Sequence, residues 1–475
     1  MMHARAHESI GEEFRNLVRG PVLLPGDAEY DEGRRLWNGR FDPRPAAIVR
    51  CADAADVAAV LRHARQHAMP VSVRGGGHSY AGHSMADGAL AIHLGDMRSV
   101  RVDAERRQAT VGPGATWGDV DAATQQHGLA TTGGTVSTVG VAGYTLGGGT
   151  GWLVRKYGLG LDNLLSAEVV TADGRVLRAS AEEHADLFWA IRGGGGNFGI
   201  VTSLEFRLHP VGPEVVMAQA FHPIERAAEA LRFYRDFAER VPDEVAVYAF
   251  VLRVPPVDPF PSNMHGAPAL AMIACHSGDL DAGETALSPV TGFGEPFLAG
   301  VQRLPYVALQ QAFDAGMPKG LRWYSRAHYL DALPDEAVDT MVRFTAALPG
   351  PFTMAYLERE GGAIGRVDPA ATAFPHRGAR YGLHIFPGWS DPADDAALVQ
   401  WAREFHAAMT PYASGGVYVN MMDRDETERL PRAYGSNLTR LAELKRVWDP
   451  ENVFRMNHNI APIRVGGDDR AASSR

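Results

Sequence analysis

The chain has 475 residues, 45% of them hydrophobic, which is long enough for two domains with real cores. Its formal net charge of -10 argues against nucleic acid or an anionic membrane as a main partner. No apolar run reaches the roughly 18 residues of a membrane span, and the charged N-terminus lacks the apolar stretch of a secretory signal. We therefore expect a cytoplasmic protein with no nucleic-acid and no membrane partner. Its two cysteines, Cys51 and Cys275, cannot form a disulfide framework, and we expect two buried thiols.

Short helices and strands alternate through the first two hundred residues. An apolar stripe that begins after the capping residue Asp53 predicts a helix over 53–68. Thr116 and Asp119 have capping-box spacing and predict a second helix, which continues to about Gln126. Alternation of apolar and polar residues predicts strands over 70–73, 88–94, 100–111 and 202–208, and a hairpin over 168–179.

The composition of the sequence changes after His209-Pro210, where glycine runs mostly stop and prolines become frequent. It changes again near 415, after which we predict a strand over Val417–Met421 and a long helix that ends at Trp448. These changes predict boundaries near 210 and 415, which divide the chain into segments 1–210, 211–415 and 416–475, the last with a tail. In the middle segment, we predict helices around 223–239, 335–347 and 393–409, and strands at 244–253, 268–275, 352–358 and 379–386.

Glycine is the compositional outlier, with 52 residues, many of them in runs. A strand that enters Arg74-Gly75-Gly76-Gly77-His78-Ser79 presents bare backbone amides in a tight turn, which is a nest suited to pyrophosphate oxygens. Arg74 and Ser79 can add side-chain donors. The second glycine-rich segment, 133–151, is small and apolar, which suits backbone packed against a flat ring system.

Other kinds of site receive little support. The GGGGNFG run at 193–199 has dinucleotide-fingerprint spacing, but it precedes a strand where a Rossmann fold needs it to follow one. Neither HExxH nor GxSxG occurs, and no Cys/His cluster is present, so we expect neither a metal site nor serine hydrolysis. Taken alone, His78 is a phosphate donor, a loop residue without a role or a residue with a special function. His83 is as readily a surface loop residue.

Several motifs together resemble one family, the FAD-linked oxidases of the berberine-bridge-enzyme type. The resemblance extends from about Pro25 to Pro462. It implies an α+β fold, in which a bipartite PCMH/VAO-type FAD-binding domain carries an inserted substrate domain built on an antiparallel sheet covered by helices. The FAD-binding domain would consist of an N-terminal part (1–210) and a C-terminal return with a tail (416–475), and the inserted part (211–415) would be the substrate domain. The motifs are RGGGHSYAGHS, TVGVAGYTLGGGTGWLVRKYGLGLDNL, DLFWAIRGGGGNFGIVTSLEF, YVN at 418–420 and RLAELKRVWDPENVFRMNHNI.

The resemblance implies FAD as the cofactor, bound covalently through its 8α carbon to His78. Many relatives add a second bond from a cysteine, but Val136 stands at that position here, so the linkage is expected to be mono-covalent. Val139 matches a residue beside the reactive edge of the flavin, where valine goes with oxygen access. The expected FAD-binding residues are His78, Arg74, Gly75, Gly76, Gly77, Ser79, Gly82, His83, Thr138, Val139, Gly140, Gly143, Gly148, Gly199, Val201, Tyr418, Asn420, Asn457 and Asn459.

For Asn457 and Asn459, the expectation is that their amides read the pyrimidine edge of the flavin, the alternative being caps between helix and tail. Tyr418 and Asn420 match the family's flavin-facing Y-x-N motif. Together these four residues would place the C-terminal return beside the ring.

The expected catalytic residues are Tyr418, Tyr356, Tyr144 and Glu358. In FTMAYLEREGG (352–362), alternation puts Tyr356, Glu358 and Glu360 on one face of a strand. The resemblance aligns Tyr356 with a family glutamate, and a tyrosine there acts as a base only if its pKa is depressed. The two glutamates are commonly just a solvated strand face.

The expected activity is that of an oxidase. Hydride would pass from a small secondary-metabolite alcohol, amine or phenolic compound to FAD, and O2 would be reduced to H2O2. Two alternatives stay open: a flavin-dependent oxygenase of a polyketide-like substrate, and a flavin-binding protein without turnover.

Overall fold

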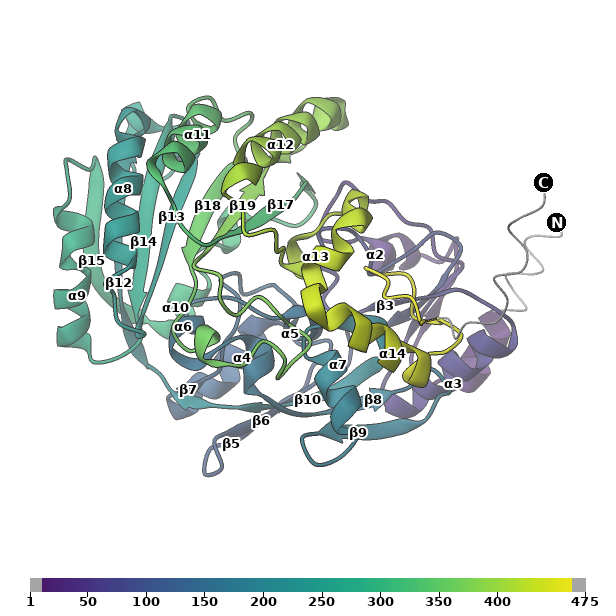
Figure 1. Cartoon of the computed structure of the whole chain (residues 1–475). Helices are drawn as coiled ribbons and strands as arrows, with labels where there is room; N and C mark the ends of the chain where they lie inside the picture. Colours follow the sequence, from purple (N-terminus) through teal and green to yellow (C-terminus); the bar gives the residue numbers. More distant parts are fainter. Residues whose placement is uncertain (1–10, 464–475) are drawn as a thin grey trace, which may run out of the picture.

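Three large β-sheets organise residues 11–463, the range that the computed structural model describes (Figure 1). Part of the N-terminal stretch on which the absence of a secretory signal rested lies outside this range. The first sheet has the order β1-β2-β4-β3, with β2, β4 and β3 parallel. Helix α3 (Ala54–Gln66) begins after Asp53, which accepts hydrogen bonds from the N–H groups of Ala55 and Asp56 as predicted. The strands are β1 (Val22–Leu23), β2 (Ala47–Arg50), β3 (Val71–Arg74) and β4 (Leu90–His93).

The second sheet is antiparallel and has the order β5-β6-β10-β8-β9. The predicted capping box of Thr116 and Asp119 is formed and begins α4. The inward face of β10 is buried as expected, at Leu204 and Phe206. The elements are β5 (Val100–Asp103), β6 (Gln108–Val111), β8 (Leu164–Val170), β9 (Val176–Ser180), β10 (Ile200–Arg207), α4 (Trp117–Thr124), α5 (Val141–Gly147), α6 (Val154–Tyr157) and α7 (Ala185–Ile191); β7 (Leu129–Ala130) pairs separately with β11 (His209–Pro210).

The third sheet lies in the inserted part, is antiparallel throughout and has the order β15-β12-β14-β13-β18-β19-β17. Helices α8, α11 and α12 lie side by side over one face, where they share a core with the sheet (Figure 1). The other face turns toward the second sheet. The strands are β12 (Glu214–Pro223), β13 (Val245–Arg253), β14 (Pro268–His276), β15 (Leu298–Pro305), β17 (Arg326–Leu330), β18 (Met354–Arg359) and β19 (Tyr381–Phe386); the helices are α8 (Ala227–Ala238), α9 (Leu280–Gly292), α11 (Asp335–Thr345) and α12 (Asp395–Met409).

The C-terminal return packs against the N-terminal part and also contacts β17 of the inserted sheet, where Arg326 pairs with Asp425 and Glu426. The ammonium of Lys445, in α14 (Leu438–Trp448), is fully buried and donates to the carbonyl oxygens of Asn197 (2.7 Å) and Phe454 (2.9 Å) and to Asp449 (2.7 Å). Val417, Leu430 and Leu441 belong to the same apolar core as β10. The return therefore completes the N-terminal part across the insertion.

One predicted strand is wrong. Residues 417–421 form no strand, because after extended Tyr418 the chain turns into a single 3-10 turn, Val419–Met421. The alternation there arises from side chains that enter the apolar core and a cavity. Strands β12, β15 and β17 and helix α9 were not predicted. The remaining short elements are α2 (Tyr30–Arg34), α10 (Tyr306–Gln310), α13 (Leu430–Tyr434), β16 (Arg322–Trp323) and β20 (Gly388–Trp389).

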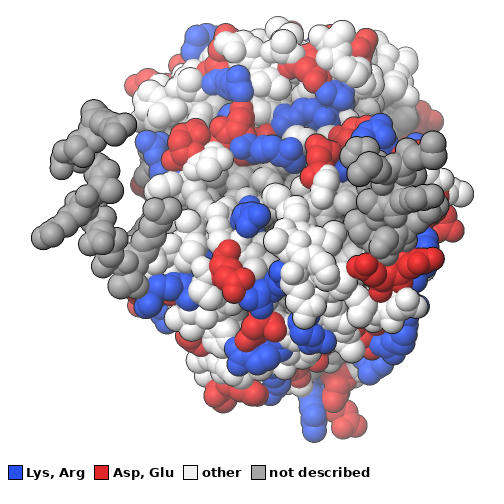
Figure 2. Space-filling model, turned by 90° about the vertical axis from the view of Figure 1, so that its right-hand side faces the viewer, with Lys and Arg blue, Asp and Glu red and all other residues white. Residues whose placement is uncertain are grey.

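Surface charge is mixed in sign. On the face shown in Figure 2, lysines and arginines lie among aspartates and glutamates, and neither sign gathers into a continuous patch. None of the helices among residues 11–463 is both long and apolar enough to cross a bilayer. Both cysteines are buried free thiols, as expected.

Candidate active site

A cavity of about 1170 Å³ lies between the glycine-rich segments and the inner face of the seven-stranded sheet. Its lining comes from all three parts of the chain: Gly75–Tyr80 in the first, Tyr248 and Tyr356 in the second, and Tyr418 in the third. Typical ligand pockets have volumes of roughly 300–1,000 Å³. This cavity therefore has room for a large ligand together with a smaller one.

The loop that follows β3 brings bare backbone to the cavity. The chain turns through Gly77, whose φ of 71° lies in the left-handed region that glycine adopts without strain. Gly76 touches the second glycine-rich segment, because a Cβ there would lie 2.6 Å from the Cα of Gly140. In the described chain, the N–H groups of residues 76–79 donate no hydrogen bond. These N–H groups are therefore available to acceptor atoms of a ligand.

His78 projects from this loop as a neutral, reactive imidazole. Its ring stacks on Trp37, with centroids 4.1 Å apart and planes 20° from parallel. Burial lowers the pKa of His78 to about 3, so the ring is uncharged at neutral pH. Its Nε2 is buried and has no partner among the described residues. A buried ring with an unpaired nitrogen suits covalent attachment of a ligand better than a charge-paired role.

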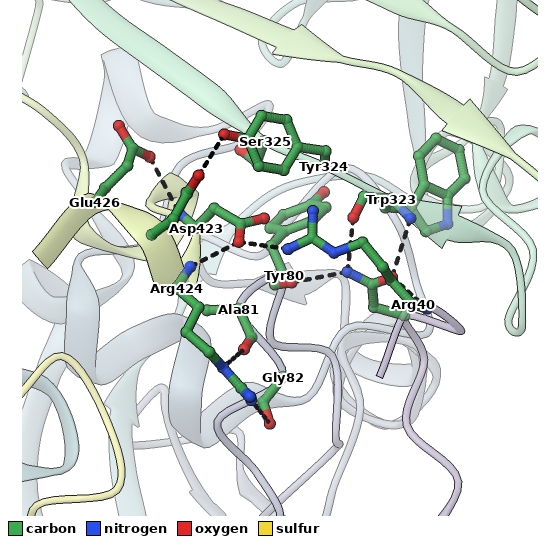
Figure 3. Close-up of polar contacts among 12 residues, drawn as sticks. Arg40, Tyr80, Ala81, Gly82, Trp323, Tyr324, Ser325, Asp423, Arg424 and Glu426 are labelled. Atoms are coloured by element: carbon green, nitrogen blue, oxygen red, sulfur yellow. Dashed lines mark hydrogen bonds and ion pairs between the residues drawn. The ribbon is translucent and has the colours of Figure 1, made fainter. Parts of the chain in front are cut away.

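Residues from all three parts hold this loop (Figure 3). The Asn38 amide donates to the carbonyl oxygens of Tyr80 (2.7 Å) and Trp323 (2.9 Å), and its oxygen accepts from the Trp323 N–H (3.0 Å). From the C-terminal return, Arg424 donates to the carbonyl oxygens of Ala81 and Gly82. The position of His78 therefore depends on packing between all three parts.

Arg40 and Asp423 form an ion pair beside this loop (Figure 3). Asp423 is fully buried and also accepts from the N–H of Arg424 (2.7 Å). The pair joins the N-terminal part directly to the C-terminal return.

The donors and the shape of the cavity fit FAD. A Cβ added at Gly143, Gly195 or Gly196 would meet nothing within 4 Å, and all three glycines line the cavity. Buried polar atoms without a partner in the described chain also face this region, namely His83 Nε2 and Asn457 Oδ1. Open space beside bare backbone, ringed by unpaired polar atoms, accommodates a large flat ligand with polar edges.

Most of the predicted FAD-binding residues meet at this cavity. Its lining includes Gly75, Gly76, Gly77, His78, Ser79, His83, Val139, Gly140, Gly143, Gly199, Val201, Tyr418, Asn420 and Asn457, as well as Val136. His83 is half-buried and is thus not a surface loop residue. The structure does not bring Arg74, Gly82, Thr138, Gly148 and Asn459 to the cavity wall. Arg74 donates to the carbonyl of Gly33 (2.8 Å), and Thr138 is exposed.

Asn457 and Asn459 occupy different surroundings. The Asn457 amide donates to the carbonyl of Gly196 (3.2 Å), and its Oδ1 remains unpaired. Asn459 also has an unpaired buried Oδ1, but it does not line the cavity. Only Asn457 is therefore placed to contact a ligand there.

Tyr418 and Tyr144 make different contacts. The Tyr418 hydroxyl accepts hydrogen bonds from the Gly149 N–H (2.7 Å) and the Asn420 amide (2.9 Å), which leaves its proton free to be donated. The Tyr144 hydroxyl already donates to the carbonyl of Thr150 (2.8 Å). Burial raises the pKa of both phenols, so both are neutral donors at neutral pH.

Two expectations for the strand over 352–362 need correction. Glu358 and Glu360 are not a solvated face, since their exposed fractions are 5% and 4%. Burial raises the pKa of Tyr356, which is opposite to the depressed pKa that a tyrosine base needs. Tyr356 and Glu358 both line the cavity, so the strand does present its predicted face to the site.

Glu358 is the acceptor at the centre of a buried polar cluster. His384 Nε2 lies 2.9 Å from its Oε1, and Glu360 and Thr150 also hydrogen-bond to its carboxylate. Burial lowers the pKa of His384 to about 4, so this ring is neutral and donates. Burial also raises the pKa of both glutamates, and repulsion from Glu358 raises that of Glu360 further. Both carboxyls therefore keep their protons to higher pH than ordinary glutamates, and the stronger shift of Glu360 makes Glu358 the one that ionises first.

His384 was missed by sequence reasoning. It pairs with Tyr356 across β18 and β19, a register that the sequence does not reveal. The hint that the sequence offers is Gly382, a glycine within the predicted strand 379–386. In the structure, a Cβ at Gly382 would lie 2.9 Å from both Glu358 Oε1 and His384 Nε2. A glycine opposite a glutamate in a buried strand pair thus marks room for such a contact.

A second group of potential ligand atoms lies elsewhere. Glu13, His63 and His67 bring their atoms within 4.8 Å of one another, although no such cluster is evident in the sequence. None of the three lines the cavity. This group is therefore separate from the candidate active site.

Comparisons with known proteins agree with this geometry. Residues 45–180 match the model of an FAD binding domain, and residues 417–461 match that of a "Berberine and berberine like" family. The (R)-6-hydroxynicotine oxidase of Paenarthrobacter nicotinovorans is 33% identical over 463 residues, with 94% of this chain and 97% of that protein covered. The xylooligosaccharide oxidase of Thermothelomyces thermophilus is 27% identical, with 98% and 96% covered. The crystal structure of 6-hydroxy-D-nicotine oxidase from Arthrobacter nicotinovorans superposes with a TM-score of 0.84 at 30% identity, with 94% and 98% covered.

Proposed function

Because this chain belongs to the berberine-like family of FAD-linked oxidoreductases, we propose that it oxidises a small metabolite and passes the electrons to O2. Its fold is the expected α+β, bipartite PCMH/VAO-type fold with an inserted antiparallel sheet. Bound FAD supplies the hydride acceptor. The observation that carries the proposal is a buried carboxylate, Glu358, held by neutral His384 on the cavity wall that faces the His78 loop.

We propose that different parts of the chain bind FAD and the substrate, as the family resemblance implies. Residues 1–210 and 416–475 hold FAD, and residues 211–415 hold the substrate. Asn457 supports this division, because it lies in the return and lines the cavity together with Gly196 from the N-terminal part. The free N–H groups of residues 76–79 then receive the pyrophosphate oxygens.

His78 is proposed as the single covalent link to FAD. A ring nitrogen of His78 would hold the flavin at its 8α carbon, each of the two giving up one hydrogen. Bound FAD would take up the two electrons that this bond formation releases, with O2 as their final acceptor. The neutral state of His78 supports this role, since the nitrogen lone pair is available for bond formation. Val136 lines the cavity and has no thiol, so a second link to FAD, which would be a thioether, cannot form there.

Glu358 is proposed as the base, with two tyrosines as hydrogen-bond donors. The carboxylate takes the proton of a substrate O–H or N–H while the adjacent C–H leaves as hydride. Tyr356 and Tyr418 line the same cavity with neutral hydroxyls, which suits them to orient the substrate. The Tyr144 hydroxyl donates to Thr150, so we assign Tyr144 to positioning of the glycine-rich backbone and not to proton transfer.

O2 is proposed as the electron acceptor. Val139 lines the cavity and is only half-buried, and its short side chain leaves a path for a small gas molecule. A Val139→Leu variant is expected to reoxidise more slowly with O2 and to retain its rate of flavin reduction by substrate.

Rapid mixing in two stages tests the function. The FAD-loaded protein is mixed without oxygen with a panel of alcohols, amines and phenols, and the flavin absorbance near 450 nm is followed. This absorbance should bleach with at least one compound and return when O2 is added. H2O2 should form in a ratio of about 1:1 to the flavin. If the product contains ¹⁸O from ¹⁸O2, the protein is an oxygenase and the oxidase proposal is wrong. Absorbance that no compound bleaches would identify a binding protein without turnover.

A further inference from the structure

The inserted sheet presents a continuous aromatic wall to the cavity. On neighbouring strands, the rings of Phe250 and Tyr356 lie 5.0 Å apart, and Tyr356 stacks on Phe386 at 5.8 Å with planes 18° from parallel. Phe313 extends the wall from another segment, 5.2 Å from Phe250. From the His78 loop, Tyr80 touches Phe386 at 4.9 Å. All of these rings line the cavity, so a ligand there meets ring faces and edges on several sides.

Most polar side chains along this wall already have partners inside the protein. Arg253 donates to the carbonyl oxygens of Leu348, Gly350 and Gly266. His265 bonds to the carbonyl of Phe260, and Thr353 donates to that of Pro349. These groups hold loops in place and offer little to a ligand.

The polar groups that β13 and β18 leave for a ligand gather at one end of the wall, and Gln219 on β12 lines the cavity away from them. In the described chain, the Tyr356 and Tyr248 hydroxyls make no hydrogen bond, and the Glu358 carboxylate lies next to Tyr356 on the same strand face. The Tyr356 ring stacks on His384 at 4.5 Å, which joins the aromatic wall to the base. The aromatic wall thus has a long apolar side and a polar corner beside Glu358.

We infer that the substrate is a planar aromatic compound whose oxidised carbon, attached to the ring, carries an O–H or N–H group. This inference rests on the proposed function and names its substrate class. The ring stacks along Phe250, Tyr356 and Phe386, where aromatic pairs gain energy beyond the area that they bury. The O–H or N–H group reaches Glu358, the carboxyl group beside Tyr356 that lines the cavity.

The reaction balances with these groups. For an aryl alcohol, the O–H proton goes to Glu358, the C–H leaves as hydride to FAD, and the aryl aldehyde or ketone is the product. O2 then takes the two electrons and two protons to form H2O2. An aryl amine gives the imine in the same way.

Carbohydrates do not match this wall. A buried sugar hydroxyl without a partner loses its bonds to water, which is costly for each group. Beside the aromatic wall, few donors and acceptors are free, whereas a disaccharide brings many hydroxyls. The relative named for oxidation of xylooligosaccharides therefore differs from this chain in its substrate class.

Three probes on the FAD-loaded protein test the inference: 4-methoxybenzyl alcohol, its methyl ether and cellobiose. Binding is read from the perturbation of the flavin absorbance during an anaerobic titration, and reaction is read from bleaching. The alcohol is expected to bind, the ether to bind about tenfold more weakly because it has no proton for Glu358, and cellobiose to cause no change up to millimolar concentration. In Glu358→Gln, the difference between alcohol and ether is expected to shrink.

A matched pair of phenylalanine variants locates the ring. Phe250→Leu removes a ring from the wall and is expected to weaken alcohol binding about two- to tenfold. Phe344→Leu removes a ring of the outer core that stacks on Phe405, and it is expected to leave binding unchanged. Equal affinities in both variants and the unchanged protein would place the ligand elsewhere.

Failure of the inference and failure of the proposed function give different results. Bleaching by cellobiose without binding of the aromatic probes would overturn the substrate class and leave the oxidase intact. Perturbation by the aromatic alcohol without bleaching by any compound would support the aromatic site and overturn the oxidase. Absence of any perturbation by the aromatic probes would also overturn the inference.

Discussion

Glu358 is the residue on which proton transfer depends. Its carboxylate accepts from His384, Glu360 and Thr150, and burial raises its pKa above that of an ordinary glutamate. Because the base must be ionised, kcat/KM is expected to fall as pH decreases through this raised pKa and to level off above it. A pH profile of anaerobic flavin reduction measures this.

Glu358→Gln should remove the acidic limb of that profile and lower the rate of reduction by about 10²- to 10⁴-fold. Glu404→Gln, at an exposed position of α12, is the control and should leave the profile unchanged. A Glu358→Gln protein with the same profile and nearly the same rate would remove Glu358 from the role of base.

Glu360 affects the stability of the fold. Stability is expected to fall as pH rises, whereas the activity that depends on Glu358 is expected to rise. Burial and Glu358 raise its pKa in the folded protein, so the folded state holds a proton that the unfolded state releases. Stability is therefore fully present below the unfolded pKa, about 4.3, and is lost as pH rises toward the folded pKa, by up to about 1.4 kcal/mol per pH unit. Glu360→Gln should be more stable than the parent at pH 8 and should match it near pH 4.5. Urea unfolding at both pH values tests this, and parallel pH dependences would contradict it.

At the residue scale, long motifs identified the site but not every residue in it. His78 and Asn457 stand in such motifs and line the cavity, whereas Asn459, in the same motif as Asn457, does not. His384 has no motif and enters the site only through the pairing of β18 with β19. The burial of Glu358 was misjudged because alternation identifies a shared face but does not show which side of the sheet is covered.

At the scale of elements, the short segment after α2 holds the His78 loop. The Trp37 ring lies between those of His78 and Trp323, at 4.1 and 5.3 Å. The backbone N–H of Trp37 donates to the carbonyl of Gly77 (3.1 Å), and its indole N–H donates to the carbonyl of Met317 (3.2 Å). Trp37→Leu keeps an apolar side chain but removes the stack, so the orientation of His78 becomes less defined. We expect FAD to bind and its covalent attachment to slow several-fold.

The measurement is the fraction of flavin that stays with acid-precipitated protein over time after FAD is added to the apoprotein. Trp401→Leu, on α12, removes a tryptophan that packs against Phe405 and should attach FAD at the parent rate. Equal rates in both variants would show that the stack does not position His78.

The Arg40–Asp423 pair is a second element-scale contact, between the N-terminal part and the return. Asp423 is fully buried, and the Arg40 side chain is 14% exposed. Asp423→Asn removes one charge of a largely buried pair, which is expected to lower the free energy of unfolding by about 3 kcal/mol. Glu428→Gln, at an exposed site in the same segment, should change it by less than about 0.5 kcal/mol. Urea denaturation compares them, and equal losses would contradict the assignment.

Elements with strong local signals were predicted well. Asp53, Thr116 and Asp119 cap their helices as expected, because a cap depends on residues within one turn. Strand β15 was not predicted, since none of its residues is fully buried and it has little alternation. The false strand at 417–421 arose from apolar side chains in a segment without a strand partner.

The whole molecule is one fold built from distant parts of the chain. Lys445 bonds to Asn197 across nearly 250 residues of sequence, and the cavity is lined by all three parts. No local pattern predicts such contacts, so the bipartite architecture came from the family resemblance and not from periodicity. The aromatic wall likewise depends on the strand order β13-β18-β19, which brings Phe250, Tyr356 and Phe386 side by side.

The central claim, that this cavity holds FAD on His78, is tested most directly by mass spectrometry of the denatured, protease-digested holoprotein. The account predicts that the peptide containing His78 carries the mass of one FAD, that no other peptide does, and that His78→Ala releases its flavin on denaturation. Flavin that leaves the unaltered protein on denaturation, or that is found on another residue, would contradict it.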